Sequence, residues 1–157
     1  MSIEDLSVEH AAVESQIKAE IADYVASVQD VEARCKAAFL PLLRDHGITR
    51  VEIYYDGGGD EGSVGEVSSY AGDEPTELPK ILCDHYSLEY SGEVESRAVQ
   101  LEDALSAFAE NAVCAHHCGW ENGDGAHGTI TIDVATGAIN LTHNMRFLDY
   151  ETSEMEL

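Results

Sequence analysis

Basic side chains are scarce in this chain of 157 residues, which has 8 Lys and Arg against 31 Asp and Glu and a formal net charge of -23. So acidic a chain repels nucleic acid phosphates and anionic membrane surfaces, because each would bring like charge to like charge. We therefore expect no direct binding to nucleic acid or membrane. The charge favours a basic protein partner, or a divalent cation held by clustered carboxylates.

Long apolar runs are also lacking. Five acidic residues interrupt the first twenty positions, so no secretory signal peptide is expected there, and no stretch is apolar enough to span a membrane. The four cysteines include no Cys-x-x-Cys pair, and in a chain of this kind free or metal-bound thiols are expected in place of disulfides. The sequence thus predicts a cytoplasmic protein.

The hydrophobic content of 44% lies in the range of folded proteins, and the length suits one domain covering residues 1–157. Within it we expect an N-terminal helical segment (7–46), a sheet-rich body (48–148) and an acidic tail (149–157). The acidity is uneven along the chain. The first 50 residues have nine acids and five bases, a net charge of -4, whereas from Val51 onward 22 acids face three bases, a net charge of -19.

Apolar residues at three- and four-residue steps predict amphipathic helix from Ser7 to about Gln29, and the same rhythm continues from Val31 to His46. Pro41 lacks an N–H, so a kink or restart is expected there, and whether this region is one helix or two stays open. A further helix is predicted over 99–117, with Gly119 after its end.

Alternating apolar residues predict strands over 48–56, 64–70, 85–90, 128–134 and 138–147, the last two as a hairpin. The four glycines within 56–62 predict a loop, and 71–79 is expected to be a solvated connection. The fold class predicted is α+β, with an antiparallel sheet of about four or five strands and with the N-terminal helices and one central helix packed on one face.

Two loops combine glycine with carboxylates, at Asp56–Gly62 and at Trp120–Gly125. Hard divalent cations bind carboxylate and carbonyl oxygens, and glycine lets a backbone turn its carbonyls inward, so Asp56, Asp60 and Asp124 are candidate metal ligands. The spacing is not that of an EF-hand. The alternative is that both loops are acidic turns that join sheet elements.

A second candidate metal site consists of Cys114, His117 and Cys118, which share one face of the predicted helix and are soft ligands suited to zinc. It requires Cys83 or His85 to arrive from the opposite side. The alternative, which we favour, is that Cys114, which falls near the buried stripe of that helix, behaves as a small apolar residue of the core.

A cysteine nucleophile assisted by His116, His117, His127 or His143 is a third possibility. The chain has no nucleophile elbow and no glycine-rich phosphate loop of the Walker type. His143 lies on the apolar side of its strand, where a hydrogen-bonded core histidine is commoner than a catalytic base. We therefore expect a non-enzymatic protein without a cofactor, apart from the divalent cation considered above.

The stretch Tyr54-Tyr55-Asp56-Gly57-Gly58-Gly59-Asp60-Glu61-Gly62, with Gly119-Trp120-Glu121-Asn122-Gly123-Asp124-Gly125 and the hairpin over 130–147, resembles an uncharacterised bacterial family known mainly from plasmids and other mobile elements. The resemblance spans Val51 to Glu154 and leaves the N-terminal helices outside it. It implies no activity. It implies a setting of mobile DNA in a bacterial host, where small acidic proteins often block defence nucleases.

The leading hypothesis is an acidic protein-interaction module, an inhibitor or nucleic-acid mimic that covers the basic groove of a CRISPR or restriction effector. The residues expected to bind this partner are Asp56, Asp60, Glu61, Glu66, Glu121 and Asp124. The alternative is a divalent-metal protein or metal-dependent hydrolase that uses the same two loops. A third possibility is an acidic domain with no such target, kept soluble by its charge.

Overall fold

The structure is a computed structural model that describes residues 3–147 and 149–157. Within these residues the elements are α1 (Ile3–Asp45), β1 (Arg50–Gly58), β2 (Glu61–Ala71), β3 (Glu74–Thr76), β4 (Leu82–Leu88), β5 (Val94–Gln100), α2 (Leu101–His116), β6 (Ala126–Asp133) and β7 (Ile139–Met145). Five strands form an antiparallel sheet in the order β3-β2-β1-β6-β7, and β4 and β5 form a separate antiparallel pair. The predicted α+β fold is confirmed.

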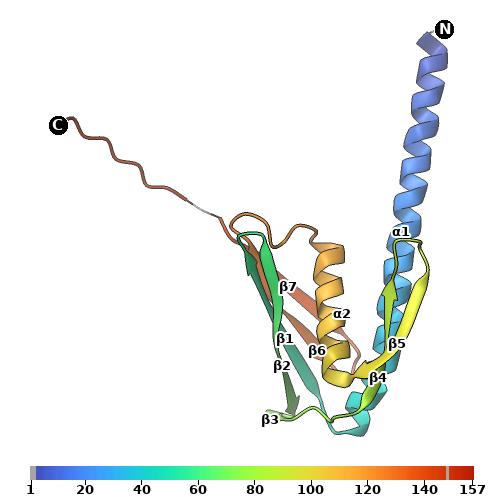
Figure 1. Cartoon of the computed structure of the whole chain (residues 1–157), viewed down its shortest axis with the longest axis vertical. Coiled ribbons are helices and arrows are strands. Elements are labelled where there is room, and N and C mark those ends of the chain that lie inside the picture. Colours follow the sequence, from blue (N-terminus) through green and yellow to red (C-terminus); the bar gives the residue numbers. More distant parts are fainter. Residues whose placement is uncertain (1–2, 148) are drawn as a thin grey trace.

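The core lies between the main sheet and the helices. Along β1 the side chains of Val51, Ile53 and Tyr55 alternate inward, and β6 shows the same alternation. Helix α2 lies over the sheet (Figure 1) and buries the stripe Leu101, Ala104, Leu105, Phe108, Ala109 and Val113. Phe39 of α1 packs edge-on against Phe108, with ring centroids 5.2 Å apart, so the two helices share this core.

The N-terminal segment is one helix, α1, which runs unbroken through Pro41. This answers the question that the sequence left open, and the predicted restart at Pro41 is wrong. Pro41 lies on the exposed side of the helix, between the buried Leu40 and Leu43. The carbonyl deprived of a donor by the proline belongs to Ala37, which is also exposed, and the packing of the neighbouring residues maintains the helix.

The glycine-rich stretch is mostly strand, which corrects the predicted loop over 56–62. β1 continues to Gly58 and β2 begins at Glu61, so only Gly59 and Asp60 form the turn, with φ of 60° and 66°. Two successive positive φ values are typical of the tight turn whose twist matches that of a β-hairpin. The glycines permit a closely packed hairpin in place of an open loop.

Three further predictions need correction. The strand predicted over 85–90 is β4, and it pairs with β5, which the sequence did not reveal, outside the main sheet. The short β3 lies in the segment predicted as a solvated connection. The central helix starts at Leu101, because residues 94–100 are extended. β5 has few buried side chains, so no apolar alternation identified it.

The tail 149–157 has no regular secondary structure and is exposed, and Figure 1 shows it leading away from the sheet. Among the described residues, no helix is both long enough and apolar enough to cross a bilayer.

Candidate functional site

The two predicted acidic loops meet in space. The backbone N–H of Gly59 donates to the carbonyl of Gly123 at 3.0 Å, and that of Asp60 donates to the carbonyl of Glu121, also at 3.0 Å. The β1–β2 turn and the segment after α2 therefore hold one another. Between them lies a hollow of about 840 Å³, the acidic hollow, with the carboxylate residues Asp56, Asp60, Glu61, Glu110 and Glu121 along its lining.

Trp120 forms one wall of the acidic hollow and explains the glycines beside it. Its ring is 7% exposed and lies against the backbone of β1 and β2. A Cβ added at Gly57 would lie 2.6 Å from the ring, and one added at Gly62 would lie 2.5 Å from it. These two glycines are required for close packing of the indole, so their presence does not need a metal to explain it.

Asp56 is engaged in an ion pair at the edge of the hollow. Its Oδ1 lies 2.7 Å from Nη2 of Arg146, and Nη1 of Arg146 donates to the carbonyl of Gly57 at 2.9 Å. The hydrogen bond from Arg146 is the main reason why the pKa of Asp56 is lowered from its usual value, with smaller contributions from Arg146 charge, His127 and Tyr54. Asp56 thus fastens the end of β7 to β1, and part of its charge is already paired.

The remaining predicted partner-binding residues are divided. Asp60, Glu61 and Glu121 line the acidic hollow with Asp56. The backbone of Asp124 lies beside Gly58, in the segment that holds the β1–β2 turn. Glu66 lies on β2 and lines a separate depression near β3, so the structure does not bring it to the hollow.

The candidate metal ligands do not gather. In residues 3–147 and 149–157, no three His, Cys, Asp or Glu side chains are grouped so that they could hold a metal ion. Cys114 and Cys118 are exposed thiols, so the expected core position of Cys114 is wrong. The ring of His117 stacks on that of His143 with centroids 3.7 Å apart. Neither proposed ligand set forms a preassembled site in this arrangement.

His143 is a hydrogen-bonded, partly buried residue. Its Nδ1 lies 2.6 Å from the hydroxyl of the buried Tyr55. Burial, followed by the nearby His117 and His127, lowers the pKa of His143, and burial raises the pKa of Tyr55. Both shifts favour the neutral forms, so the pair acts as a structural hydrogen bond at neutral pH. His116 is occupied elsewhere, with Nε2 2.8 Å from Oε1 of Glu32 on α1.

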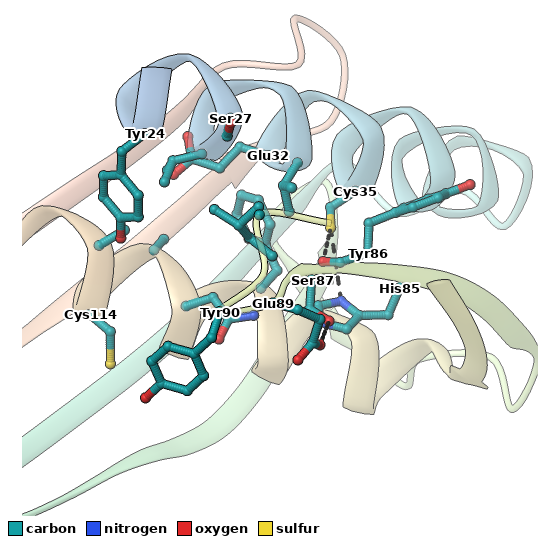
Figure 2. Close-up of a pocket in the computed structure, with 18 of the residues that line it drawn as sticks. Tyr24, Ser27, Glu32, Cys35, His85, Tyr86, Ser87, Glu89, Tyr90 and Cys114 are labelled. Carbon is teal, nitrogen blue, oxygen red and sulfur yellow. Dashed lines mark hydrogen bonds between the residues drawn. The ribbon is translucent and has the colours of Figure 1, made fainter. Parts of the chain in front are cut away.

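A second hollow, the apolar groove, lies between α1, α2 and the β4–β5 turn and has a volume of about 590 Å³. Figure 2 shows Cys35 pointing from α1 toward His85 of β4, with Tyr24 and Tyr90 at the other end. The Sγ of Cys35 lies 3.9 Å from Nδ1 of His85 and donates to the carbonyl of Tyr86 at 3.3 Å.

The Cys35–His85 pair is not arranged as a nucleophile and base. Burial is the main cause that raises the pKa of Cys35 and also the main cause that lowers the pKa of His85. Both groups are therefore neutral at pH 7, whereas a cysteine nucleophile needs the thiolate. From the sequence we considered His116, His117, His127 and His143 beside a cysteine and did not consider His85 in that role.

The model of a family of unknown function, DUF6878, matches residues 31–157. The chain belongs to this family. The matched range includes Val51 to Glu154, where the resemblance was expected, and also the C-terminal third of α1, but the match says nothing of plasmids or of the two loop motifs. No curated protein and no solved structure matches the chain.

The DUF6878 match begins at the point where α1 joins the core. Val31 is the first buried residue among those whose burial is described, and residues 7–30 of α1 are exposed or half-buried. Both hollows lie mainly within the DUF6878 body, since only Asp23, Tyr24, Ser27 and Val28 of the lining residues precede it. The rest of α1 extends outside it.

Sequence reasoning missed one carboxylate of the hollow. Glu110 lies on α2, one turn before Cys114, and both face the β1–β2 turn. The only indication in the sequence was that Glu110 lies opposite the buried stripe of α2. That signal shows which side of a helix is solvent-facing, but it does not show which loop folds back over that side.

Proposed function

We propose that the protein is a non-enzymatic interaction module that binds a basic surface of another protein through the acidic hollow. The observation that carries this proposal is the convergence of Asp60, Glu61, Glu110 and Glu121, from three separate segments, on one hollow. Among the described residues that line it, none is Lys or Arg. A concave surface of one charge sign concentrates its field and attracts oppositely charged groups.

The rigidity of the hollow supports this role. The Trp120 ring packs against Gly57 and Gly62, and two backbone hydrogen bonds hold the facing segments together. Because the backbone that carries these carboxylates is already held in place, binding a partner does not also have to order the loops, so more of the interaction energy appears as affinity.

The class of partner we propose is a nucleic-acid-binding enzyme such as a CRISPR or restriction effector. Such enzymes carry clustered Lys and Arg that contact phosphates, and fixed carboxylates are able to compete for the same side chains. The resemblance to proteins of plasmids and mobile elements is consistent with an inhibitor of host defence. The net charge of -23 adds a long-range attraction toward any such basic groove.

The test begins with capture from a bacterial lysate at low salt, identification of the retained protein and its purification. Binding of the purified partner should fall steeply between about 50 and 200 mM salt, and duplex DNA should displace the acidic protein from it. The triple variant Asp60→Asn/Glu61→Gln/Glu121→Gln should bind at least tenfold more weakly.

The matched control is Glu66→Gln/Glu74→Gln/Glu77→Gln, which removes the same number of charges near β3, away from the hollow. Its affinity for the partner should be within about twofold of that of the unmodified protein, a smaller change than the loss of one well-placed charged contact would cause. Equal losses in both triple variants would mean that only net charge matters, and salt-independent binding would contradict the mimicry of nucleic acid.

A further inference from the structure

The apolar stripe of α1 is buried in its C-terminal part and exposed in its N-terminal part. The exposed residues recur at three- and four-residue steps on one side of the helix, and each is 46–57% exposed: Val13, Ile17, Ile21, Tyr24 and Val25. The same stripe continues into the core through Val31, Cys35 and Phe39. Figure 1 shows the exposed part of α1 extending well beyond the other elements.

The exposed stripe leads into the apolar groove. Tyr24 and Val28 belong to the helix and also line the groove, opposite Leu88 and Phe108. Figure 2 shows Tyr24 at this end of the groove, on the same side as Tyr90. From Val13 to Val28 the helix covers about 22 Å at 1.5 Å per residue, which is enough to pair with about four turns of another helix.

The charges beside this surface are acidic. Residues 1–30 have seven acids and one base, Lys18, for a net charge of -6. On a helical projection Glu20 lies at one border of the exposed stripe, and Glu14 lies near the other border, which also has Lys18. Asp23, Glu32 and Glu89 are among the residues that line the groove, and no described lining residue is Lys or Arg.

A second copy of this chain fits the surface poorly. Pairing two such helices in either direction would bring together two segments of net charge -6, with glutamates beside the apolar contact of each. Like charges beside a helical seam disfavour that pairing, and opposite charges select a partner. The surface complements a helix with one apolar side and Lys or Arg at its borders.

We infer that the exposed stripe of α1, together with the apolar groove, is a binding site for a basic amphipathic helix of another protein. The partner helix lies along α1 from Val13 to Val28, places its apolar anchors on Ile17, Ile21 and Tyr24, and seats one end in the groove. Its basic borders face the glutamates of α1. This mode follows the general rule that an amphipathic helix binds an apolar groove through anchors at i, i+3, i+4 and i+7. The site shares only Cys114 with the lining of the acidic hollow and does not use the carboxylates of that hollow.

The test uses defined peptides in place of an unknown ligand. A synthetic 18-residue helix of Leu and Lys, with Leu on one side, should bind the full chain in fluorescence anisotropy at low salt. A scrambled peptide of the same composition has equal charge but no apolar side, so it should bind at least tenfold more weakly. A Leu and Glu helix of the same pattern should not bind.

The variant that tests the site is Ile17→Gln/Ile21→Gln, which keeps good helix formers in α1 and removes two anchors. It should weaken binding of the Leu and Lys helix at least tenfold. The matched control is Val8→Gln/Ala19→Gln, two exposed residues of the same helix on its other side, and it should bind within twofold. Circular dichroism should show equal helix content and equal melting for both variants, since all four side chains are exposed.

Two outcomes would overturn the inference. Equal binding of the amphipathic and scrambled peptides would show that the peptides are attracted by opposite charge alone and that the apolar groove does not bind them. Sedimentation of the unmodified chain as a dimer that Ile17→Gln/Ile21→Gln dissociates would make a second copy the occupant. The triple variant of the acidic hollow should leave binding of the Leu and Lys helix unchanged, so that failure here and failure of the proposed function are separate results.

Discussion

Replacing Gly62 by Ala is the sharpest test of the packing that shapes the acidic hollow. The added Cβ would lie 2.5 Å from Cη2 of Trp120 and 2.9 Å from both Cζ2 and Cζ3. Real Cβ atoms do not approach other heavy atoms so closely, so either the indole or the hairpin must move. The indole has little room, because a Cβ added at Gly57 would also lie only 2.6 Å from it.

Overpacking of this kind costs about 1–3 kcal/mol. Gly58→Ala is the matched control, because it makes the same chemical change in the same hairpin and its Cβ would come no nearer than 3.4 Å to its nearest neighbour, the carbonyl oxygen of Asp124. Replacing a glycine by alanine where the backbone permits it stabilises by about 0.4–1 kcal/mol through the unfolded state. That gain is common to both variants, so they should differ by the overpacking cost alone, about 1–3 kcal/mol.

Urea unfolding, followed by the fluorescence of the single tryptophan, measures this difference. In Gly62→Ala the native emission should also shift to longer wavelength as the indole moves toward water. In the background of Trp120→Ala, where urea unfolding is followed by circular dichroism because the fluorophore is absent, the effect of Gly62→Ala should largely vanish, since the clash has lost its partner. Equal stability of Gly62→Ala and Gly58→Ala would refute the view that these glycines serve Trp120.

Three other results are expected. Burial lowers the pKa of His143, so the unfolded chain takes up a proton at this histidine more readily than the folded one. The stability of the fold should therefore fall as the pH drops below about 6.5. The variant His143→Gln should show a smaller fall in melting temperature over that range. Alkylation of the native protein, followed by mass spectrometry, should label the exposed Cys114 and Cys118 and should label Cys35 and Cys83, which are buried, only after unfolding. Early labelling of Cys35 and Cys83 would contradict the structure. Burial also raises the pKa of Cys83 to about 11, which slows its reaction further. At constant ionic strength, EDTA, calcium, magnesium and zinc should leave the melting temperature unchanged, since a cation that bound only the folded form would raise it.

The sequence was sufficient to predict the elements whose residues alternate between core and solvent. β1 and β6 have one buried side, and period two is visible in Val51, Ile53, Ile130 and Ile132. The buried stripe of α2 was equally clear. β5 was not predicted because its side chains are mostly exposed, so the sequence has no hydrophobic pattern that indicates its pairing with β4.

The prediction of α1 shows a different limit. The helical spacing of its apolar residues was recognised over the whole of α1, and such a periodic apolar stripe is usually interpreted as a buried one. Periodicity reports only that one side of the helix is apolar, and it does not say whether anything in the same chain covers that side. Ile17 and Phe39 have the same place in the pattern, yet one is 50% exposed and the other is 1% exposed.

The candidate site was partly predictable for a physical reason. Asp56, Asp60 and Glu121 were identified from composition, because glycine and carboxylates mark loops, but their meeting depends on the backbone hydrogen bonds between Gly59 and Gly123 and between Asp60 and Glu121. Such bonds carry no side-chain signature. Glu66 was chosen on the same grounds of charge and lies elsewhere, so charge alone did not locate the hollow.

The carboxylates of the acidic hollow should reduce the stability of the protein that holds them. Asp60, Glu61, Glu110 and Glu121 carry like charge around one hollow, and their repulsion opposes folding. Salt screens that repulsion, so added NaCl should raise the melting temperature, and the variant Asp60→Asn/Glu61→Gln/Glu121→Gln should melt higher than the unmodified protein at low salt. The difference should shrink as salt is added, whereas packing differences would persist. If the triple variant melts lower at every salt concentration, the three side chains stabilise the fold and their convergence needs no partner. If it melts higher, the residues persist at a cost to stability, as binding residues commonly do.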